Sequence, residues 1–172
     1  MKNAVFLIGF MGVGKTTVSD IIGERYSYHV LDLDESIVQA DGRKISDIFH
    51  ESGESYFRNL ETEQLQCLPE FDRIIVSCGG GVVLRQKNVE IMRKKGWIVL
   101  LTAKPATILE RVKTDESRPI LKDHMEESYI AELMEKRYDA YKNAADICVS
   151  TDGKTASEVA DEVMKNIRRM EQ

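Results

Sequence analysis

The most informative part of the sequence is Ala4-Val5-Phe6-Leu7-Ile8-Gly9-Phe10-Met11-Gly12-Val13-Gly14-Lys15-Thr16. A short apolar run leads into Gly9–Thr16, which fits G-x-x-x-x-G-K-[ST], and a segment of helical spacing, Gly14–Tyr26, follows. Glycines in this pattern let backbone N–H groups surround phosphate oxygens, and the helix N-terminus adds its positive dipole end. Lys15 supplies a charge to the outer phosphates, and Thr16 supplies a hydroxyl to a magnesium ion. The stretch predicts a nucleotide site; the alternative is a glycine-rich turn with an incidental lysine.

The rest of the chain alternates strand-like and helix-like segments. Apolar runs of strand length recur at His29–Leu31, Arg73–Ser77, Trp97–Leu101 and Asp146–Val149. Helical spacing occurs in Ile45 to about Leu68, with a break near Ser52-Gly53, and in Gln86–Lys95, Pro105–Val112, Glu127–Ala144 and Thr155–Met170. Because the apolar runs are nearly continuous rather than alternating, we expect strands that are buried on both faces. The pattern predicts a three-layer α/β domain with a parallel sheet.

Composition limits the possible partners. A chain of 172 residues, 42% hydrophobic and 31% charged, suits one folded domain over residues 1–172. With 24 basic and 29 acidic residues the net charge is −5, so we expect no nucleic-acid partner. The apolar run near the start is about half of the ~20 residues that a membrane span needs, so no membrane association is expected. Three cysteines without a C-x-x-C pair indicate a reducing, cytoplasmic setting, and nothing marks a dimer surface, so we expect a monomer.

Two acids follow the second predicted strand, in Asp32-Leu33-Asp34. If the strand continues through them, alternation places both carboxylates on one face. At the carboxyl end of a parallel strand that face borders the ligand crevice, where one acid can hold metal-bound water and the other can accept a proton. The alternatives are a solvated strand end, or an Asp34 that caps a helix beginning at Glu35.

Ser77-Cys78-Gly79-Gly80-Gly81 follows the third predicted strand. Three consecutive glycines carry a large conformational-entropy cost, so they indicate close approach of a ligand to the backbone or a backbone with positive φ. The alternative is a loop that needs glycine only for its turn.

Three arginines stand out by position. Arg137 interrupts the apolar stripe of the segment Glu127–Ala144, and a cation on that face needs an anionic partner. Arg58 lies one turn before Glu61, and the two could form a simple surface ion pair. Arg118 lies in a long polar stretch that is a candidate mobile loop.

Together these motifs resemble the shikimate kinase family over essentially the whole chain. The matching motifs are Gly9–Thr16 followed by Thr17, Asp32-Leu33-Asp34, Phe57-Arg58-Asn59-Leu60-Glu61, Ser77 through Gly81, Arg118-Pro119, and Arg137 with Tyr141. The resemblance implies an α/β three-layer P-loop kinase with a five-stranded parallel sheet of order 2-3-1-4-5, flanked by helices and carrying a mobile lid at about residues 112–127. It also implies ATP-dependent phosphorylation of shikimate at its 3-hydroxyl, on the route to chorismate and aromatic amino acids.

The resemblance assigns roles to individual residues. The implied ATP-binding residues are Gly12, Val13, Gly14, Lys15, Thr16, Thr17, Arg111 and Arg118, with Arg111 against the adenine. The implied shikimate-binding residues are Asp34, Arg58, Gly79, Gly80, Gly81 and Arg137, largely from a region of about residues 32–61. Mg²⁺ would be held at Thr16 and Asp32, and the implied catalytic residues are Lys15, Asp34 and Arg118. Two departures are Asp139, where the family commonly has proline, and Cys78, where it has a small Thr-like residue.

From the residues themselves, other readings stay open. Arginine forks suit the carboxylate of an acceptor, and Asp34 can orient a hydroxyl toward the γ-phosphate. A P-loop kinase acting on gluconate or on a nucleoside monophosphate would also need such arginines. A nucleotide-binding module without a small-molecule acceptor would not readily explain Arg58, Arg137 and Asp34 together.

Overall fold

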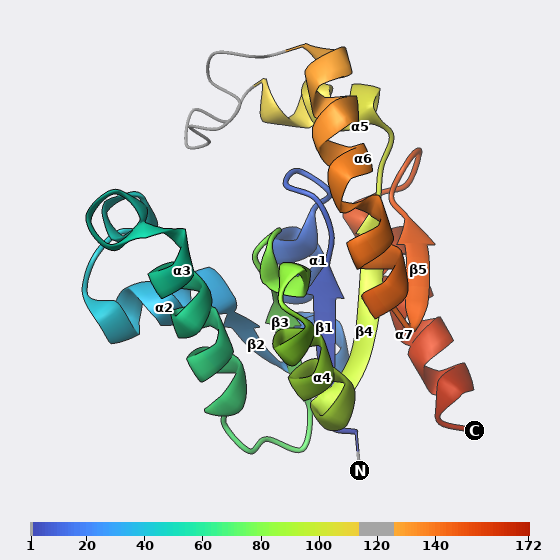
Figure 1. The fold of residues 1–172 in the computed structure, drawn as a ribbon. Coiled ribbons are helices and arrows are strands. Elements are labelled where there is room, and N and C mark those ends of the chain that lie inside the picture. Colours follow the sequence, from blue (N-terminus) through green and yellow to red (C-terminus); the bar gives the residue numbers. More distant parts are fainter. Residues whose placement is uncertain (1, 114–125) are drawn as a thin grey trace.

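The computed structural model describes residues 2–113 and 126–172, and its centre is a parallel sheet (Figure 1). The sheet has five strands in the order β2-β3-β1-β4-β5, as the resemblance implied. The strands are β1 Ala4–Ile8, β2 His29–Asp32, β3 Ile74–Ser77, β4 Gly96–Thr102 and β5 Ile147–Ser150. All the strand pairs are parallel.

Helices cover both faces of the sheet. They are α1 Lys15–Tyr26, α2 Leu33–Asp41, α3 Ile45–Gln66, α4 Gln86–Lys95, α5 Pro105–Val112, α6 Glu127–Ala144 and α7 Ala156–Met170, with a 3₁₀ turn η1 at Val82–Leu84. Helices α1 and α7 pack together on one face, whereas α4 packs on β4 on the other; α2 and α3 extend beyond the β2 edge (Figure 1). Among the described helices none is long and apolar enough to cross a bilayer.

Burial differs between the central and the edge strands. Every residue of β1 and β3 is buried, and β4 is nearly so. The two edge strands contradict the expectation of burial on both faces, because β5 alternates between buried and exposed residues and Val30 of β2 is 43% exposed. An edge strand has a neighbour on one side only and less helix cover, so its outer side chains meet water.

Most predicted helices are confirmed, including the break in α3, where Gly53 has a φ of 82°. The predicted start at Thr155 is one residue early, because Thr155 is the N-cap of α7 and forms a capping box with Glu158.

Helix α2 shows that Asp32 and Asp34 do not lie on one continuous strand, as the sequence analysis expected. Asp32 ends β2 and caps α2 by accepting a hydrogen bond from the Glu35 N–H at 3.0 Å. Asp34 therefore lies in the first helical turn, and strand alternation does not set its direction.

The topology places the site at the carboxyl ends of the strands. After β1 the chain forms β2 and β3 on one side of β1, and it then crosses over to form β4 and β5 on the other side. Such a switch point leaves a crevice at the carboxyl ends of the strands. The phosphate-loop motif, Asp32 and the triple-glycine loop each follow directly after, or end, one of three adjacent strands.

Candidate active site

The phosphate loop is built by backbone conformation. Gly9, Gly12 and Gly14 have φ values of 145°, 81° and 96°, which side chains rarely allow. A Cβ on Gly9 would also lie 2.5 Å from the carbonyl oxygen of Leu101. Gly14 is the N-cap of α1, so no N-cap side chain competes for the N–H groups of the first helical turn. The loop therefore has the backbone geometry that an anion site at a helix N-terminus requires.

Lys15 folds back over this loop. Its Nζ donates hydrogen bonds to the carbonyl oxygens of Gly9 at 2.7 Å and Phe10 at 3.1 Å. These bonds hold the ammonium group at the mouth of the loop rather than in bulk solvent. The charge is thus positioned before any phosphate arrives.

A cavity of about 230 Å³ joins the loop to the neighbouring strand ends. Its lining includes these residues from the sequence-predicted site: Gly12, Gly14, Lys15, Thr16, Thr17, Asp32, Asp34, Gly79 and Gly80. The Thr16 hydroxyl and the Asp32 carboxylate offer two oxygen donors in one cavity, which suits Mg²⁺ because it usually takes few protein ligands beside substrate phosphates and water. Among the residues the structure describes, no cluster of three or more His, Cys, Asp or Glu side chains forms a metal cage.

The triple-glycine loop is explained by space. None of its glycines has positive φ, so that part of the expectation is wrong. Close approach of a ligand stays a prediction, and what the structure shows is close approach of protein side chains to the backbone. A Cβ on Gly79 would lie 2.9 Å from Asp34 Oδ1 and 3.4 Å from Glu61 Oε1. One on Gly80 would lie 3.3 Å from Arg137 Nη1, and one on Gly81 would lie 2.2 Å from Arg58 Nη2.

Each glycine thus meets a different charged residue of the predicted acceptor site. Asp34 comes from α2, Arg58 from α3 and Arg137 from α6, and the loop after β3 lies between them. The backbone of residues 79–81 is the common surface on which these side chains converge. A Cβ at position 81 would overlap the Arg58 guanidinium, whereas a Cβ at position 79 or 80 would need only a small shift of the Asp34 or Arg137 side chain.

Arg58 and Glu61 form a buried pair rather than a surface one. Arg58 Nη1 lies 2.7 Å from Glu61 Oε2, and the exposed fractions of the two side chains are 11% and 0%. Arg58 also reaches the exposed Glu54 at 3.3 Å. Burial raises the pKa of Glu61, and the nearby Arg58 guanidinium opposes this shift without cancelling it. The second carboxylate oxygen of Glu61 is buried and has no hydrogen-bond partner among the described residues.

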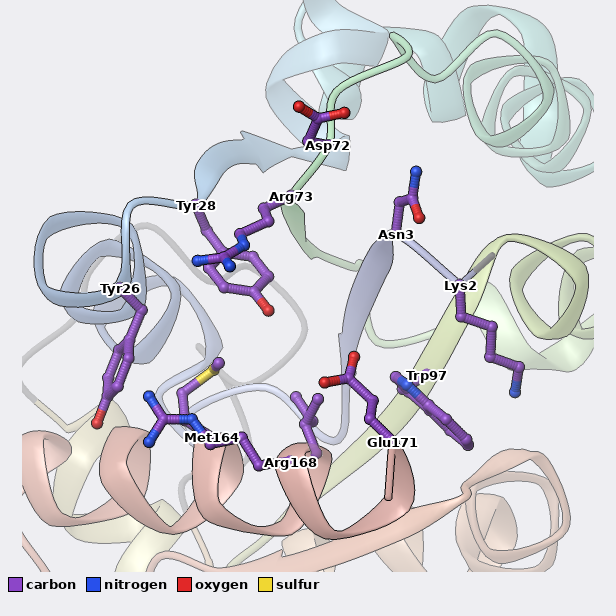
Figure 2. A pocket seen from close by; sticks show the side chains of 11 residues that line it. Lys2, Asn3, Tyr26, Tyr28, Asp72, Arg73, Trp97, Met164, Arg168 and Glu171 are labelled. Atoms are coloured by element: carbon purple, nitrogen blue, oxygen red, sulfur yellow. The ribbon is translucent and has the colours of Figure 1, made fainter.

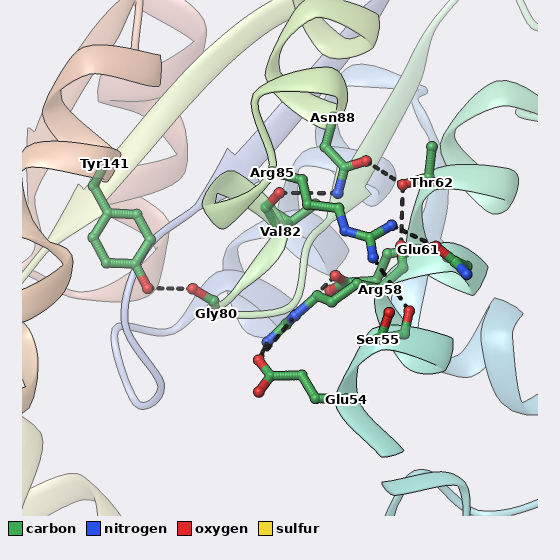
Figure 3. Close-up of polar contacts among 11 residues, drawn as sticks. Glu54, Ser55, Arg58, Glu61, Thr62, Gly80, Val82, Arg85, Asn88 and Tyr141 are labelled. Atoms are coloured by element: carbon green, nitrogen blue, oxygen red, sulfur yellow. Dashed lines mark hydrogen bonds and ion pairs between the residues drawn. The ribbon is translucent and has the colours of Figure 1, made fainter. Parts of the chain in front are cut away.

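Tyr141 joins α6 to the loop from the other side. Its hydroxyl donates a hydrogen bond to the carbonyl oxygen of Gly80 (Figure 3). Burial raises the pKa of Tyr141, so the hydroxyl stays protonated and can donate. Arg137, one turn earlier on α6, is half-buried, whereas Asp139 is exposed to solvent.

A hydrogen-bond network ties α3 to the segment after the glycine loop (Figure 3). Thr62 Oγ1 donates its one proton to the nearer of two acceptors, Asn88 Oδ1 at 2.7 Å, and also lies 3.0 Å from the carbonyl oxygen of Arg58. Asn88 Nδ2 donates to the carbonyl oxygen of Val82 at 3.0 Å. Arg85 donates to Asn59 Oδ1 at 2.7 Å and to the carbonyl oxygen of Ser55 at 3.2 Å. Sequence reasoning missed Thr62, Arg85 and Asn88, and no local pattern marks them.

Arg111 borders the phosphate loop at its outer side. From α5 it donates to the carbonyl oxygens of Gly12 at 3.2 Å and Val13 at 3.3 Å, and to Thr151 Oγ1 at 3.1 Å. Its role against adenine stays a prediction. Arg118 and most of the predicted lid, residues 112–127, lie outside the described residues.

Cys78 lies in the lining of the cavity at the phosphate loop. Burial raises the pKa of the Cys78 thiol, so Cys78 stays neutral and packs as a small apolar side chain beside the glycine loop.

A larger cavity of about 640 Å³ lies at the other end of the sheet, where the strands begin. It is lined by residues such as Asn3, Tyr28, Trp97 and Glu171 (Figure 2). It shares no lining residue with the cavity at the phosphate loop.

A strand, glycine loop and helix with a lysine over the loop, faced by carboxylates and arginines, define a P-loop kinase. The family model described as shikimate kinase matches residues 11–168. The shikimate kinase of Sulfurihydrogenibium sp. (strain YO3AOP1) is 40% identical over 98% of this chain and 99% of its own length, and that of Thermodesulfovibrio yellowstonii is 41% identical over 99% and 97%. Shikimate kinase from Acinetobacter baumannii in complex with shikimate superposes with a TM-score of 0.89 at 29% identity, covering 98% of this chain and 94% of that one. The chain belongs to the shikimate kinase family.

Proposed function

We propose that the protein transfers the γ-phosphoryl group of ATP to the 3-hydroxyl of shikimate, giving shikimate 3-phosphate and ADP. The observation that carries this proposal is the convergence of Asp34, Arg58 and Arg137 on the triple-glycine loop beside the phosphate loop. The related enzyme from Acinetobacter baumannii, which has a very similar fold, was solved with shikimate bound.

ATP binds at the glycine loop in this proposal. The N–H groups of the loop and of the first turn of α1 receive the phosphates, with Thr17 at their edge and Arg111 toward the adenine. Lys15 exchanges its carbonyl partners for phosphate oxygens and stabilises the charge that develops on the migrating group. Mg²⁺, when bound with ATP, neutralises charge on the phosphates, and Thr16 and Asp32 are the residues that would hold it.

Shikimate carries a carboxylate and hydroxyl groups, and the acceptor side offers a partner for each kind. Arg58 and Arg137 present guanidinium groups beside Gly81 and Gly80, which suit a carboxylate. Asp34 orients the reacting hydroxyl and accepts its proton as the phosphoryl group is transferred. The glycine backbone lets the ring approach closely.

The remaining parts of the proposal concern closure and setting. Residues 112–127 act as a lid, and Arg118 contacts the phosphates when it closes. Asp34, Arg58, Arg137 and the phosphate loop meet within one chain among the described residues, and the proposal takes the protein as a monomer. All three cysteines are free, which supports a reducing, cytoplasmic setting.

A panel of acceptors tests the function. With ATP and Mg²⁺, coupled detection of ADP is compared for shikimate, gluconate and a nucleoside monophosphate. We expect saturable turnover with shikimate and background with the others. Higher turnover with another acceptor would reassign the substrate, and background with every acceptor would favour a nucleotide-binding module.

A further inference from the structure

Helix α3 carries Arg58, yet it does not rest on the sheet. It lies beyond the β2 edge and packs chiefly against α2 and α4 (Figure 1). The glycine loop, by contrast, continues directly from β3, which pairs with β1 and β2 in the sheet. The position of Arg58 relative to the loop therefore depends on what joins α3 to the segment after the loop.

One connection is buried. Thr62 lies one helical turn after Arg58 and is 5% exposed, and Asn88 at the start of α4 is fully buried. Their side chains form a 2.7 Å hydrogen bond, and Asn88 passes the connection to the carbonyl oxygen of Val82, the residue that follows Gly81. Buried hydrogen bonds are directional and unscreened, so they fix the relative position of two elements more tightly than apolar contacts do.

A second connection reaches α3 at the surface. Arg85 donates to Asn59, the residue after Arg58, and to the backbone of Ser55, three residues before Arg58. Water surrounds these bonds, so their contribution is smaller than that of the buried pair. The segment 82–88 thus holds the Arg58 turn at two levels.

We propose that Thr62, Asn88 and Arg85 are positioning residues of the acceptor site, which hold Arg58 and Glu61 in register with Gly79–Gly81. The inference rests on the proposed function and extends it to residues that do not touch the acceptor. The contact they control is tight, because the Arg58 guanidinium occupies the space that a Cβ on Gly81 would need. A shift of α3 by about 1 Å would displace the guanidinium from the acceptor carboxylate, and misplacements of that size cost up to about 10²-fold in rate.

A matched pair of variants at position 62 tests this. Thr62→Val keeps the branched shape and loses the hydroxyl, whereas Thr62→Ser keeps the hydroxyl. We expect Thr62→Val to raise the KM for shikimate by about tenfold, as a lost buried hydrogen bond predicts, and Thr62→Ser to stay within about twofold of wild type. The KM for ATP and the kcat should change little in both variants. Faster hydrogen exchange over residues 55–62 in Thr62→Val would report the loosened turn without reference to activity.

Arg85→Ala and Arg93→Ala extend the test to exposed bonds. Arg93 lies on α4, the helix that Arg85 precedes as its N-cap residue, and donates to the carbonyl oxygen of Asn143 on α6 rather than to α3. Arg85→Ala should raise the KM for shikimate by about two- to threefold, and Arg93→Ala should leave it unchanged. If Thr62→Val fails to fold, the Arg85 and Arg93 pair decides the question.

The outcomes separate the positioning role from a structural one. A role in stability alone would lower the melting temperature of Thr62→Val while its KM for shikimate matched that of Thr62→Ser, and this result would overturn the inference. Equal KM values for Arg85→Ala and Arg93→Ala would also count against it. Failure of the proposed function would appear differently, as absence of shikimate turnover in the wild-type protein.

Discussion

The phosphate side of the cleft comes from one continuous stretch, Gly9–Thr17, whereas the acceptor side draws on α2, α3, the loop after β3 and α6. The phosphate loop relies on backbone conformation, with three glycines at positive φ and Lys15 bound to backbone carbonyl oxygens. The acceptor side relies on side chains that meet across long sequence distances and pair with one another before any substrate binds. On the proposed function we expect the two substrates to be recognised by different means, so substitutions should separate the two sides kinetically.

The largest effect is expected on the phosphate side. Lys15→Met should leave the fold intact and lower kcat by about 10²- to 10³-fold, because it removes a preorganised charge from the transition state. Steady-state kinetics and a thermal melt of the same preparation measure both quantities. A variant with normal melting and near wild-type kcat would contradict the role of Lys15.

Substitutions of Asp34 and Asp32, which lie where the phosphate side and the acceptor side meet, should affect kcat and its Mg²⁺ dependence differently. Asp34→Asn keeps the shape but cannot take a proton, so kcat should fall by about 10²-fold while the KM for shikimate changes little. Asp32→Asn should instead be partly restored by raised Mg²⁺, because a weakened metal site is filled at higher concentration. A magnesium titration of both variants at saturating substrates is the measurement. Rescue of Asp34→Asn alone would reverse the assignment.

Arg58→Ala tests the acceptor side. Losing a charge-assisted hydrogen bond to the acceptor carboxylate should cost about 10- to 150-fold in kcat/KM for shikimate, with the KM for ATP almost unchanged. The variant also leaves Glu61 without its partner, so its stability must be measured alongside. Arg137→Ala provides a comparison that leaves the Arg58 and Glu61 pair intact. Loss of ATP affinity with retained acceptor affinity in these variants would mean that the two sides are reversed.

The smallest expected effect is a pH dependence of stability at Glu61. Its folded pKa is raised above the ordinary value of 4.5 by burial, so the folded state favours the protonated carboxyl. The stability from this group is present below about pH 4.5 and is lost as the pH rises through the higher folded pKa. Urea unfolding of Glu61→Gln and wild type across this range should show the difference shifting in favour of the variant as pH rises. A shift in the opposite direction would mean that the Arg58 pair outweighs burial.

Local features of the chain could be predicted from the sequence. Helix and strand periodicity and the phosphate-loop motif are local, and they identified most elements and the nucleotide side. Helix α2 was expected only as an alternative, beginning at Glu35 with Asp34 as its cap, because its start coincides with the end of β2. The structure begins it at Leu33 with Asp32 as the cap, and Gly42 ends it with a φ of 85°. Asp34 was placed correctly in the crevice but for a wrong reason.

The acceptor side was predictable only in part. The arginines and the triple glycine carry motif-level signals, but the spacing requirement at Gly79–Gly81 appears only when the side chains of three helices are placed around the loop. The bond from Thr62 to Asn88 joins residues on two helices, and its existence depends on how α3 packs against α4. Local periodicity does not encode such a pairing.

The proposed reaction transfers the γ-phosphoryl group of ATP, bound at the phosphate loop, to a hydroxyl of shikimate bound on the acceptor side. The most direct measurement is ³¹P NMR of a reaction of the wild-type protein with ATP, Mg²⁺ and shikimate, followed until ATP is consumed. We expect one new phosphomonoester signal in equal amount to ADP, coupled to the proton at C3 of shikimate, and no change when shikimate is omitted. Release of inorganic phosphate in place of that signal, or a phosphomonoester at another hydroxyl, would contradict it.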